Sequence, residues 1–136
     1  MVLPGLAGQA LRGEPMTVFG DGRQTRSFAH VRDAVEALAA LLDAPGAEGE
    51  VVNVGSDEEV SILELAERVR AAAGSSSEIV LVPYDEAYAE GFEDMRRRVP
   101  DLRKLERLVG FRPRTPLDAA IRDVLAEERL PQGAGA

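Results

Sequence analysis

Met16 to Phe28 read MTVFGDGRQTRSF. The pattern predicts a β-hairpin: a short apolar strand, a tight turn at Asp21–Arg23, and a second strand that carries Arg26. Val18 and Phe19 would then offer an apolar or aromatic surface beside a fixed cation. Such a pair suits a ligand with a flat ring and a nearby phosphate, because a guanidinium matches phosphate oxygens with paired hydrogen bonds. The alternative is a plain hairpin whose arginine is solvated.

Five segments around this stretch have the apolar spacing or the boundary residues of helices. They are Pro4–Arg12, Val31–Leu42, Ile62–Ala73, Leu102–Val109 and Pro116–Leu130. The clearest is Val31–Leu42, in which apolar residues recur at i, i+3, i+4 and i+7. Glycines end several of these segments, and Ser61 with Glu64 forms a capping box.

Strands are expected at Glu50–Val54 and, as a second and buried strand, at Ile79–Val82. Tyr84–Arg98 has no clear period, and its length in a compact domain suggests a functional loop. Helices that alternate with short strands predict a small α+β domain. We expect this domain to span residues 1–130, with residues 131–136 as a frayed tail.

The net charge of −8 is unevenly distributed. Residues 1–32 hold four basic and two acidic residues, residues 33–67 hold ten acidic and no basic ones, and the rest holds twelve of each. A nucleic-acid-binding protein would be expected to carry a basic stripe, so that partner is disfavoured. The local positive excess lies around the predicted phosphate site.

The chain has no cysteine, which excludes disulfides, thiol nucleophiles and cysteine metal sites. No apolar run approaches the roughly 20 residues that span a bilayer, and the start lacks the layout of a secretory signal. We therefore expect no membrane partner, and the cytoplasm is the default location.

The ordered set of motifs resembles the substrate-domain signature of nucleotide-sugar epimerases, dehydratases and decarboxylases of the extended short-chain dehydrogenase/reductase superfamily. The resemblance begins at Gly13–Phe28 and His30–Asp33. It continues in order through four later segments, which are Glu50–Ser56, Ser61–Ala66, Arg98–Asp101 and Leu108–Pro113. It thus covers nearly the whole chain.

The resemblance implies a C-terminal, substrate-binding domain. In such enzymes this domain packs beside a Rossmann NAD-binding domain, and the sugar nucleotide lies in the cleft between them. The implied partners are therefore a UDP-sugar or dTDP-sugar and the Rossmann half, which this chain lacks. NAD is the implied cofactor of the full-length enzyme, an isomerase or lyase, and none is expected in this chain. Gln24–Phe28 is most similar to the UDP-glucose epimerase and UDP-glucuronate decarboxylase branches, which favours uracil as the base.

By resemblance, Thr17, Val18 and Phe19 line the pocket for the base. Many family members have tyrosine at the position of Phe19, so the ring is kept and one polar contact is lost. The backbone at Leu3 and Pro4 matches a segment that approaches the base.

Three further residues match the phosphate side of the family's site. Arg26 is similar to the diphosphate-binding arginine, Arg98 to a second arginine near the phosphates, and Asn53 to an asparagine at the end of a strand. Two arginines around one diphosphate make physical sense, because charge-assisted hydrogen bonds contribute more where water is partly excluded.

The family's catalytic residues are not found in this chain. The family uses a tyrosine with a lysine four residues on, whereas Tyr84 and Tyr88 are followed at that spacing by Tyr88 and Phe92, and the single lysine is Lys104. Gly20–Gly22 is a G-x-G without a third glycine or a following helix, so it does not predict a pyrophosphate loop. We therefore predict no catalytic or cofactor-binding residue here, and no activity of the chain alone.

Other constellations have simpler alternatives. A triad or zinc site at His30, the sole histidine, would need partners that the spacing does not show, and a packing or hydrogen-bonding role at a helix start is favoured. Asp57, Glu58 and Glu59 are adjacent and cannot all face one point, so a solvated turn is favoured and no metal site is predicted. Arg96–Arg98 fits either a phosphate site or a solvated face.

Three functions remain to be compared. The preferred one is the substrate-binding domain of an NAD-dependent nucleotide-sugar enzyme. The second is a standalone binding module, which should carry polar residues on the surface that a Rossmann domain would otherwise cover. The third is a structural domain with a dead pocket, against which the presence of Arg26 and Arg98 argues. Because half a cleft excludes little water, we expect the chain alone to bind a nucleotide sugar weakly or not measurably.

Overall fold

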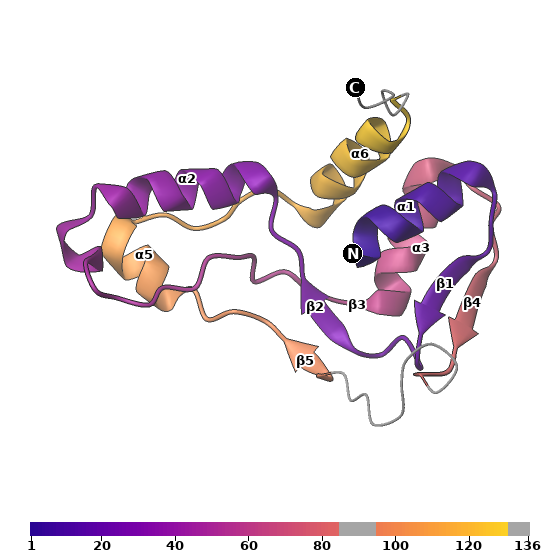
Figure 1. Ribbon diagram of the computed structural model, residues 1–136, viewed down its shortest axis with the longest axis horizontal. Helices are drawn as coiled ribbons and strands as arrows, with labels where there is room; N and C mark the ends of the chain where they lie inside the picture. Colours follow the sequence, from indigo (N-terminus) through magenta and orange to yellow (C-terminus); the bar gives the residue numbers. More distant parts are fainter. Residues whose placement is uncertain (85–94, 131–136) are drawn as a thin grey trace, which may run out of the picture. The chain divides into compact units, whose positions relative to one another are not determined.

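The computed structural model describes residues 1–84 and 95–130 (Figure 1). Within these residues it contains five α-helices and five short strands, which confirms the predicted α+β class. The chain forms two compact units. The described parts of residues 1–24, 61–96 and 118–136 make the first unit, and residues 25–60 and 97–117 make the second. None of the described helices is both long and apolar enough to cross a membrane.

The first unit is built on two helices and a two-stranded parallel sheet. The helices α1 (Val2–Arg12) and α3 (Ile62–Ala73) pack against each other, and both contact β1 (Met16–Phe19). β1 pairs in register with β4 (Ile79–Val82). The buried side chains of these elements form the core: Leu3, Leu6, Ala7, Ala10, Met16, Val18, Ile62, Leu65, Ala66 and Val69.

The ends of these helices follow the predicted local rules. α1 ends at Gly13, which has a φ of 69°, and α3 ends at Gly74, with a φ of 63°. Both values lie in the left-handed region that glycine adopts without a Cβ clash. α3 begins at Ser61, whose Oγ accepts a hydrogen bond of 3.1 Å from the N–H of Glu64. These three helix boundaries therefore follow from local residues: a serine that caps the start of α3, and glycines that allow the left-handed turn at the ends of α1 and α3.

α6 (Leu117–Glu128) begins one residue after the predicted Pro116. Leu117, Ala120, Ile121 and Leu125 are buried, whereas Val124 is only half-buried. From Asp118 onward the helix belongs to the first unit, where the carboxylate of Asp118 pairs with Arg68 of α3 at 2.7 Å.

The predicted hairpin is wrong. β1 pairs with β4, whereas β2 (Thr25–Ser27) lies in a second sheet with the order β3-β2-β5. The turn between β1 and β2 does form, but its carbonyl groups accept hydrogen bonds from the first residues of α3. Gly22 O accepts from the N–H of Leu63 at 3.0 Å, and Gln24 O accepts from the N–H of Ile62 at 3.1 Å. These bonds cap the first turn of α3, and the chain leaves the turn toward β3 and β5 instead of returning along β1.

The second unit holds β2 with β3 (Glu59–Ser61, whose last residue belongs to the first unit) and β5 (Arg97–Arg98). β2 and β5 are parallel, and Thr25 is opposite Arg97. The helices α2 (Val31–Leu42) and α5 (Arg103–Val109) pack against each other.

The helices of the second unit match their predicted positions closely. α2 has the predicted bounds. His30 caps it, since its Nδ1 accepts from the N–H of Arg32 at 3.1 Å, which confirms a hydrogen-bonding role at a helix start. α5 begins one residue later than predicted, and the carboxylate of Asp101 accepts from the N–H of Arg103 at 3.0 Å.

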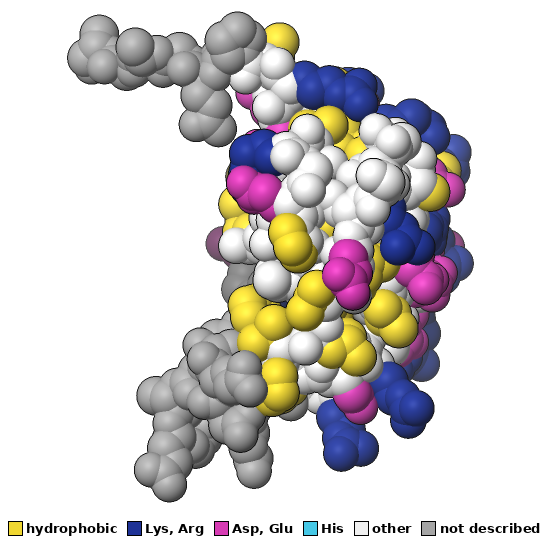
Figure 2. Space-filling model, turned by 90° about the vertical axis from the view of Figure 1, so that its right-hand side faces the viewer, with side chains coloured by type: hydrophobic (Ala, Val, Ile, Leu, Met, Phe, Trp, Pro, Cys, Tyr) yellow, Lys and Arg dark blue, Asp and Glu magenta, His cyan; other side chains and the backbone are white. Residues whose placement is uncertain are grey.

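Two strand predictions need correction. Glu50–Val54 is irregular instead of a strand, and Val51 is 85% exposed. Ile79–Val82 is a strand, but it is not buried as predicted. It has β1 as its one neighbour among the described strands. β1 and β4 lie on the right in Figure 1, and the surface on that side carries a group of hydrophobic side chains (Figure 2).

The predicted loop Tyr84–Arg98 is only partly described. Residues 85–94 lie outside the described part of the chain, as does the predicted tail at residues 131–136. At its C-terminal end the loop is replaced by β5 (Arg97–Arg98), since these two residues find β2 as a strand partner.

The turn that starts at Gly20 gives a test of the first unit. Gly20 has a φ of 72°, and a Cβ at this position would lie 2.3 Å from Cε2 of Tyr84. We expect Gly20→Ala to lower the free energy of unfolding by about 2–4 kcal/mol, through left-handed backbone strain and the clash with the ring. Urea denaturation measures this loss.

Gly13→Ala is the matched control, because Gly13 has a φ of 69° and nothing within 4 Å of its Cβ position. It should lose only the strain component, about 1 kcal/mol. Equal losses for the two variants would contradict the packing of Tyr84 on Gly20.

Candidate functional site

The three residues predicted to line the base pocket lie on β1 in the first unit. Burial alternates along this strand, so Thr17 and Phe19 share one face while Val18 points into the core and is fully buried. The side-chain amide of Gln9 holds Thr17 twice: its Oε1 accepts from the Thr17 N–H and its Nε2 donates to the Thr17 Oγ1, both at 3.0 Å. The half-buried face of β1 is thus fixed by α1.

The glycines that follow β1 do not fit a dinucleotide. A Cβ at Gly22 would lie 2.9 Å from Cβ of Leu63, and the Cβ position of Gly20 is filled by the ring of Tyr84. These glycines therefore make room for the protein's own side chains. A strand follows the turn where a pyrophosphate loop would continue into a helix. The turn at Gly20–Gly22 therefore does not have the geometry of a pyrophosphate-binding loop.

Gln24 is a residue that the sequence interpretation overlooked. Its Nε2 donates to the carbonyl of Phe19 at 2.9 Å, which braces the turn after β1. Its Oε1 is the one buried side-chain oxygen or nitrogen in the described residues that has no hydrogen-bond partner. A glutamine in a polar turn carries no sequence signal for this role.

The phosphate-side residues lie in the second unit. Arg26 is at the centre of β2, and Arg98 stands directly opposite it on β5. Arg26 is only 7% exposed, and its Nη1 donates to the carbonyl of Thr25 at 2.7 Å, whereas Arg98 is exposed. The structure therefore brings the two predicted arginines together as neighbours on one sheet.

At the neighbouring position of the same two strands, the charge of the arginine is paired with a carboxylate. Arg97, opposite Thr25, donates to both carboxylate oxygens of Glu59, with Nη2 to Oε2 at 2.9 Å and Nε to Oε1 at 3.0 Å. Thr25 Oγ1 donates to the same carboxylate at 2.5 Å. These hydrogen bonds, first from Arg97 and then from Thr25, lower the pKa of Glu59, and the carboxylate raises the pKa of Arg97. Side chains alternate along a strand, so Arg97 faces away from Arg98. Arg98 makes no ion pair within the described ranges.

Asn53 lies on the irregular segment Glu50–Val54 and is exposed. Its Nδ2 donates to the carbonyl of Asp101 at 3.3 Å, which ties it to the chain just after Arg98. The carboxylate of Asp101 is held by Arg103, which lowers the pKa of Asp101 to about 2. Asn53 and the two arginines thus belong to the same unit, and Thr17, Val18 and Phe19 belong to the other.

The acidic run at Asp57–Glu59 binds three different partners. Asp57 pairs with Arg112 at 2.7 Å, Glu58 accepts from the N–H of Leu117 at 2.9 Å, and Glu59 binds Arg97. Residues 1–84 and 95–130 contain no group of three or more acidic or histidine side chains placed to hold a metal ion. Asp57 and Glu59 are exposed, as a solvated turn predicts, and the three side chains also have partners in the second unit.

Asp33 is another residue whose role only the structure shows. Its buried carboxylate accepts three hydrogen bonds: from the N–H of Arg114 at 3.2 Å, from the N–H of Thr115 at 3.0 Å and from the Oγ1 of Thr115 at 2.9 Å. It therefore fixes the start of α2 to the segment that leads into α6. The single lysine, Lys104, pairs with Glu50 in the same unit.

Two relatives among known proteins are similar to this chain in sequence. The chain is 40% identical over 124 residues to a UDP-N-acetyl-alpha-D-glucosaminuronate decarboxylase of Bacillus cytotoxicus, across 91% of this chain and 38% of that protein. It is 39% identical over 113 residues to UDP-glucuronic acid decarboxylase 1 of Danio rerio, across 83% of this chain and 25% of that protein.

Solved structures show the same fold. A UDP-glucose 4-epimerase from Thermotoga maritima, crystallised with UDP-glucose, matches with a TM-score of 0.83 and 25% identity, over 95% of this chain and 39% of that one. A UDP-glucuronic acid 4-epimerase from Bacillus cereus in complex with NAD matches with a TM-score of 0.79 and 26% identity, over 95% and 38%.

The fold and these neighbours define the class as the NAD-dependent epimerases and dehydratases of the extended short-chain dehydrogenase/reductases, which confirms the resemblance found in the sequence. The model of the GDP-mannose 4,6 dehydratase family matches residues 2–124. The chain therefore belongs to the GDP-mannose 4,6 dehydratase family. It spans well under half the length of the relatives that it matches.

The Glu59–Arg97 pair makes stability depend on pH. The pKa of Glu59 is lower in the folded chain than its ordinary value of 4.5, so its stabilising effect is complete above that value and is lost as the pH falls through the folded pKa. We expect Glu59→Gln to lower the melting temperature at about pH 7 and to have little effect near pH 2.

Glu67→Gln, at an exposed position of α3, is the control and should change the melting temperature little at either pH. A Glu59→Gln loss of the same size at both pH values would show that the charge of Glu59 does not stabilise the sheet.

Proposed function

We propose that this chain is the substrate-binding part of an NAD-dependent nucleotide-sugar epimerase, dehydratase or decarboxylase. In this proposal it holds the base and the diphosphate of a UDP-sugar or dTDP-sugar. The observation that carries the proposal is the register of β2 and β5, which sets Arg26 opposite Arg98.

Two cations at directly opposite strand positions repel each other. A diphosphate between them would replace this repulsion with charge-assisted hydrogen bonds, which guanidinium groups form in pairs with phosphate oxygens. The neighbouring Arg97 pairs with Glu59 and is therefore not assigned to the diphosphate. The burial of Arg26 strengthens the effect, since less water screens its charge.

The base is assigned to β1. Thr17 and Phe19 share its half-buried face, and the Phe19 ring gives a flat surface for the base. The side chain of Val18 is in the core, so Val18 contributes through its backbone. Asn53 is assigned to the phosphate side, because it is hydrogen-bonded to the segment that follows Arg98.

Uracil is the favoured base. The similar decarboxylases and epimerases are named for UDP-linked sugars, and this chain is 40% identical to one of them. These names describe the relatives, and the motif Gln24–Phe28 carries the likeness into this chain.

We assign NAD and the proton-transfer residues of the full-length enzyme to the part of the relatives that this chain does not cover. Neither a Tyr-x-x-x-Lys pair nor a fitting glycine loop occurs in this sequence. The chain alone is therefore expected to bind substrate and to be inactive. A standalone module is less well supported, because apolar side chains of α2 are exposed where such a module should be polar.

Titration of the chain with UDP, followed by the NMR shifts of its backbone amides, tests this function. We expect saturable binding with a Kd of about 1 mM or weaker, since only half of the cleft is present. The largest shifts should lie at β2 and β5. Arg98→Ala should weaken binding about tenfold, because it removes a charge-assisted contact.

Arg12→Ala is the control for loss of one exposed arginine, which here pairs with Glu14 outside the proposed site, and it should bind UDP unchanged. Uridine, which lacks the diphosphate, should bind at least about tenfold more weakly than UDP. Equal affinity for uridine and UDP, or no effect of Arg98→Ala, would contradict the assignment of the diphosphate. A micromolar Kd would contradict the expected weakness of half a cleft.

A further inference from the structure

A cavity lies within the second unit, between α2 and the chain at the end of α5. α2 contributes Asp33, Glu36 and Ala40 to its wall, and the opposite wall consists of residues from the segment 109–114. Its volume is about 330 Å³, which is in the range of small-molecule sites in proteins. None of the residues assigned above to the base or the diphosphate lines this cavity. It is therefore a separate candidate site.

Two of the four charged side chains at the cavity already have partners. The carboxylate of Asp33 accepts its three hydrogen bonds from Arg114 and Thr115. The guanidinium of Arg112 pairs with the carboxylate of Asp57 at 2.7 Å. Because Asp33 binds the backbone N–H groups of Arg114 and Thr115, it also holds the two walls of the cavity in place.

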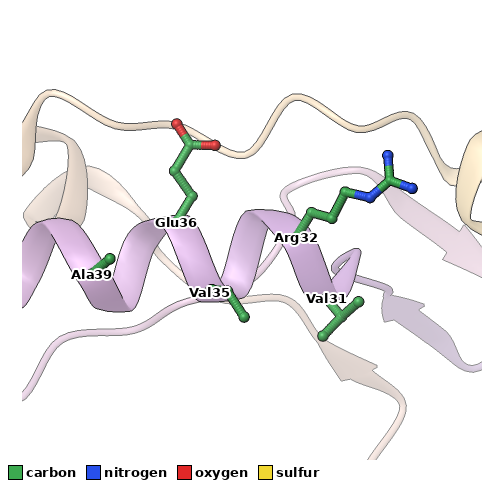
Figure 3. Close-up of a pocket in the computed structure, with 5 residues that line it drawn as sticks. All are labelled: Val31, Arg32, Val35, Glu36 and Ala39. Carbon is green, nitrogen blue, oxygen red and sulfur yellow. The ribbon is translucent and has the colours of Figure 1, made fainter.

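The other two charged side chains, Glu36 and Arg114, are not paired. Within residues 1–84 and 95–130 neither has an ion pair or a side-chain hydrogen bond, and they do not pair with each other although they line one cavity. Glu36 projects from the side of α2 opposite to Val31 and Val35, toward the segment that follows α5 (Figure 3). The cavity thus has one unpaired charge of each sign, on opposite walls.

The rest of the cavity wall is largely apolar. Ala40, Val109 and Phe111 line it, and all three side chains are half-buried. An aromatic ring such as that of Phe111 offers a flat apolar surface to a bound group. This part of the cavity suits an aliphatic or aromatic group.

We propose that this cavity binds a free α-amino acid with an aromatic or large aliphatic side chain. Its ammonium group pairs with Glu36, its carboxylate pairs with Arg114, and its side chain lies against Val109 and Phe111. The two unpaired charges of the site match the two charges of such a zwitterion, which carries no net charge. This inference does not depend on the proposed function.

Charge argues against a phosphate or a nucleotide in this cavity. Two carboxylates, those of Glu36 and Asp33, line it beside one unpaired arginine. A phosphate group would therefore meet repulsion as well as attraction, and like charges that are brought close together cost binding free energy. A metal ion is also disfavoured, because the described residues contain no group of three or more acidic or histidine side chains placed to hold one.

Titration of the chain with L-phenylalanine, followed by the NMR shifts of its backbone amides, tests the proposal. We expect saturable binding with a Kd of about 1 mM, since both ion pairs lie at an open cavity and are partly screened by water. The largest shifts should lie at Glu36, Ala40 and the segment 109–114. No saturable shift at these amides up to about 10 mM would overturn the proposal.

Two analogues each remove one charge of the ligand. 3-Phenylpropionate keeps the ring and the carboxylate but lacks the ammonium group. L-Phenylalaninamide keeps the ring and the ammonium group, which is protonated at about pH 6, but lacks the carboxylate. Each analogue should bind about tenfold more weakly than L-phenylalanine, because each loses one charge-assisted contact. Equal affinity for all three compounds would contradict the paired charges.

Two variants assign each charge of the ligand to its side chain. Glu36→Gln should weaken L-phenylalanine about tenfold and leave 3-phenylpropionate unchanged, because that compound has no ammonium group to lose a partner. Arg114→Gln should weaken L-phenylalanine about tenfold and leave L-phenylalaninamide unchanged. Both side chains are exposed and without a partner in the described chain, so the fold should not depend on them.

The matched controls are Glu67→Gln and Arg12→Gln, at exposed positions of the first unit. Both should bind L-phenylalanine with unchanged affinity. Equal weakening by the controls, or no weakening by Glu36→Gln and Arg114→Gln, would overturn the proposal. So would inorganic phosphate that shifts the same amides at lower concentrations than L-phenylalanine, because the site would then be an anion site. All these measurements are made without UDP, so a failure of the proposed UDP site would leave their outcome unchanged.

Discussion

The parallel pairing of β2 with β5 is the constraint on which the proposed site depends. It joins residues more than 70 positions apart in the sequence, and its register fixes which side chains are neighbours. At one position Arg97 meets Thr25, and both bind Glu59, which neutralises that pair. At the next position Arg26 meets Arg98, where like charges are adjacent. A slip of one residue in either direction would move the Arg98 side chain to the other face of the sheet, away from Arg26.

Local rules were enough to predict most helices of this chain. Val31–Leu42 was predicted with its observed bounds, and Gly13, Gly74 and Ser61 end or begin helices as expected. These signals act within one helical turn, so they do not depend on the rest of the fold.

Strand pairing was harder to predict, because it depends on distant partners. The turn after Phe19 suggested a hairpin, but its carbonyl groups cap α3, about 40 residues later. Likewise, no local feature of Glu50–Val54 shows that the described chain has no strand for it. The resemblance supplied Arg26 and Arg98, whereas the residues that support the fold around them, Glu59, Asp33 and Gln24, became evident only from their contacts.

The diphosphate assignment is central, and a crystal structure of the chain with UDP tests it most directly. The account predicts diphosphate oxygens at about 3 Å from guanidinium nitrogens of both Arg26 and Arg98. A diphosphate bound elsewhere, with neither arginine in contact with it, would contradict the account.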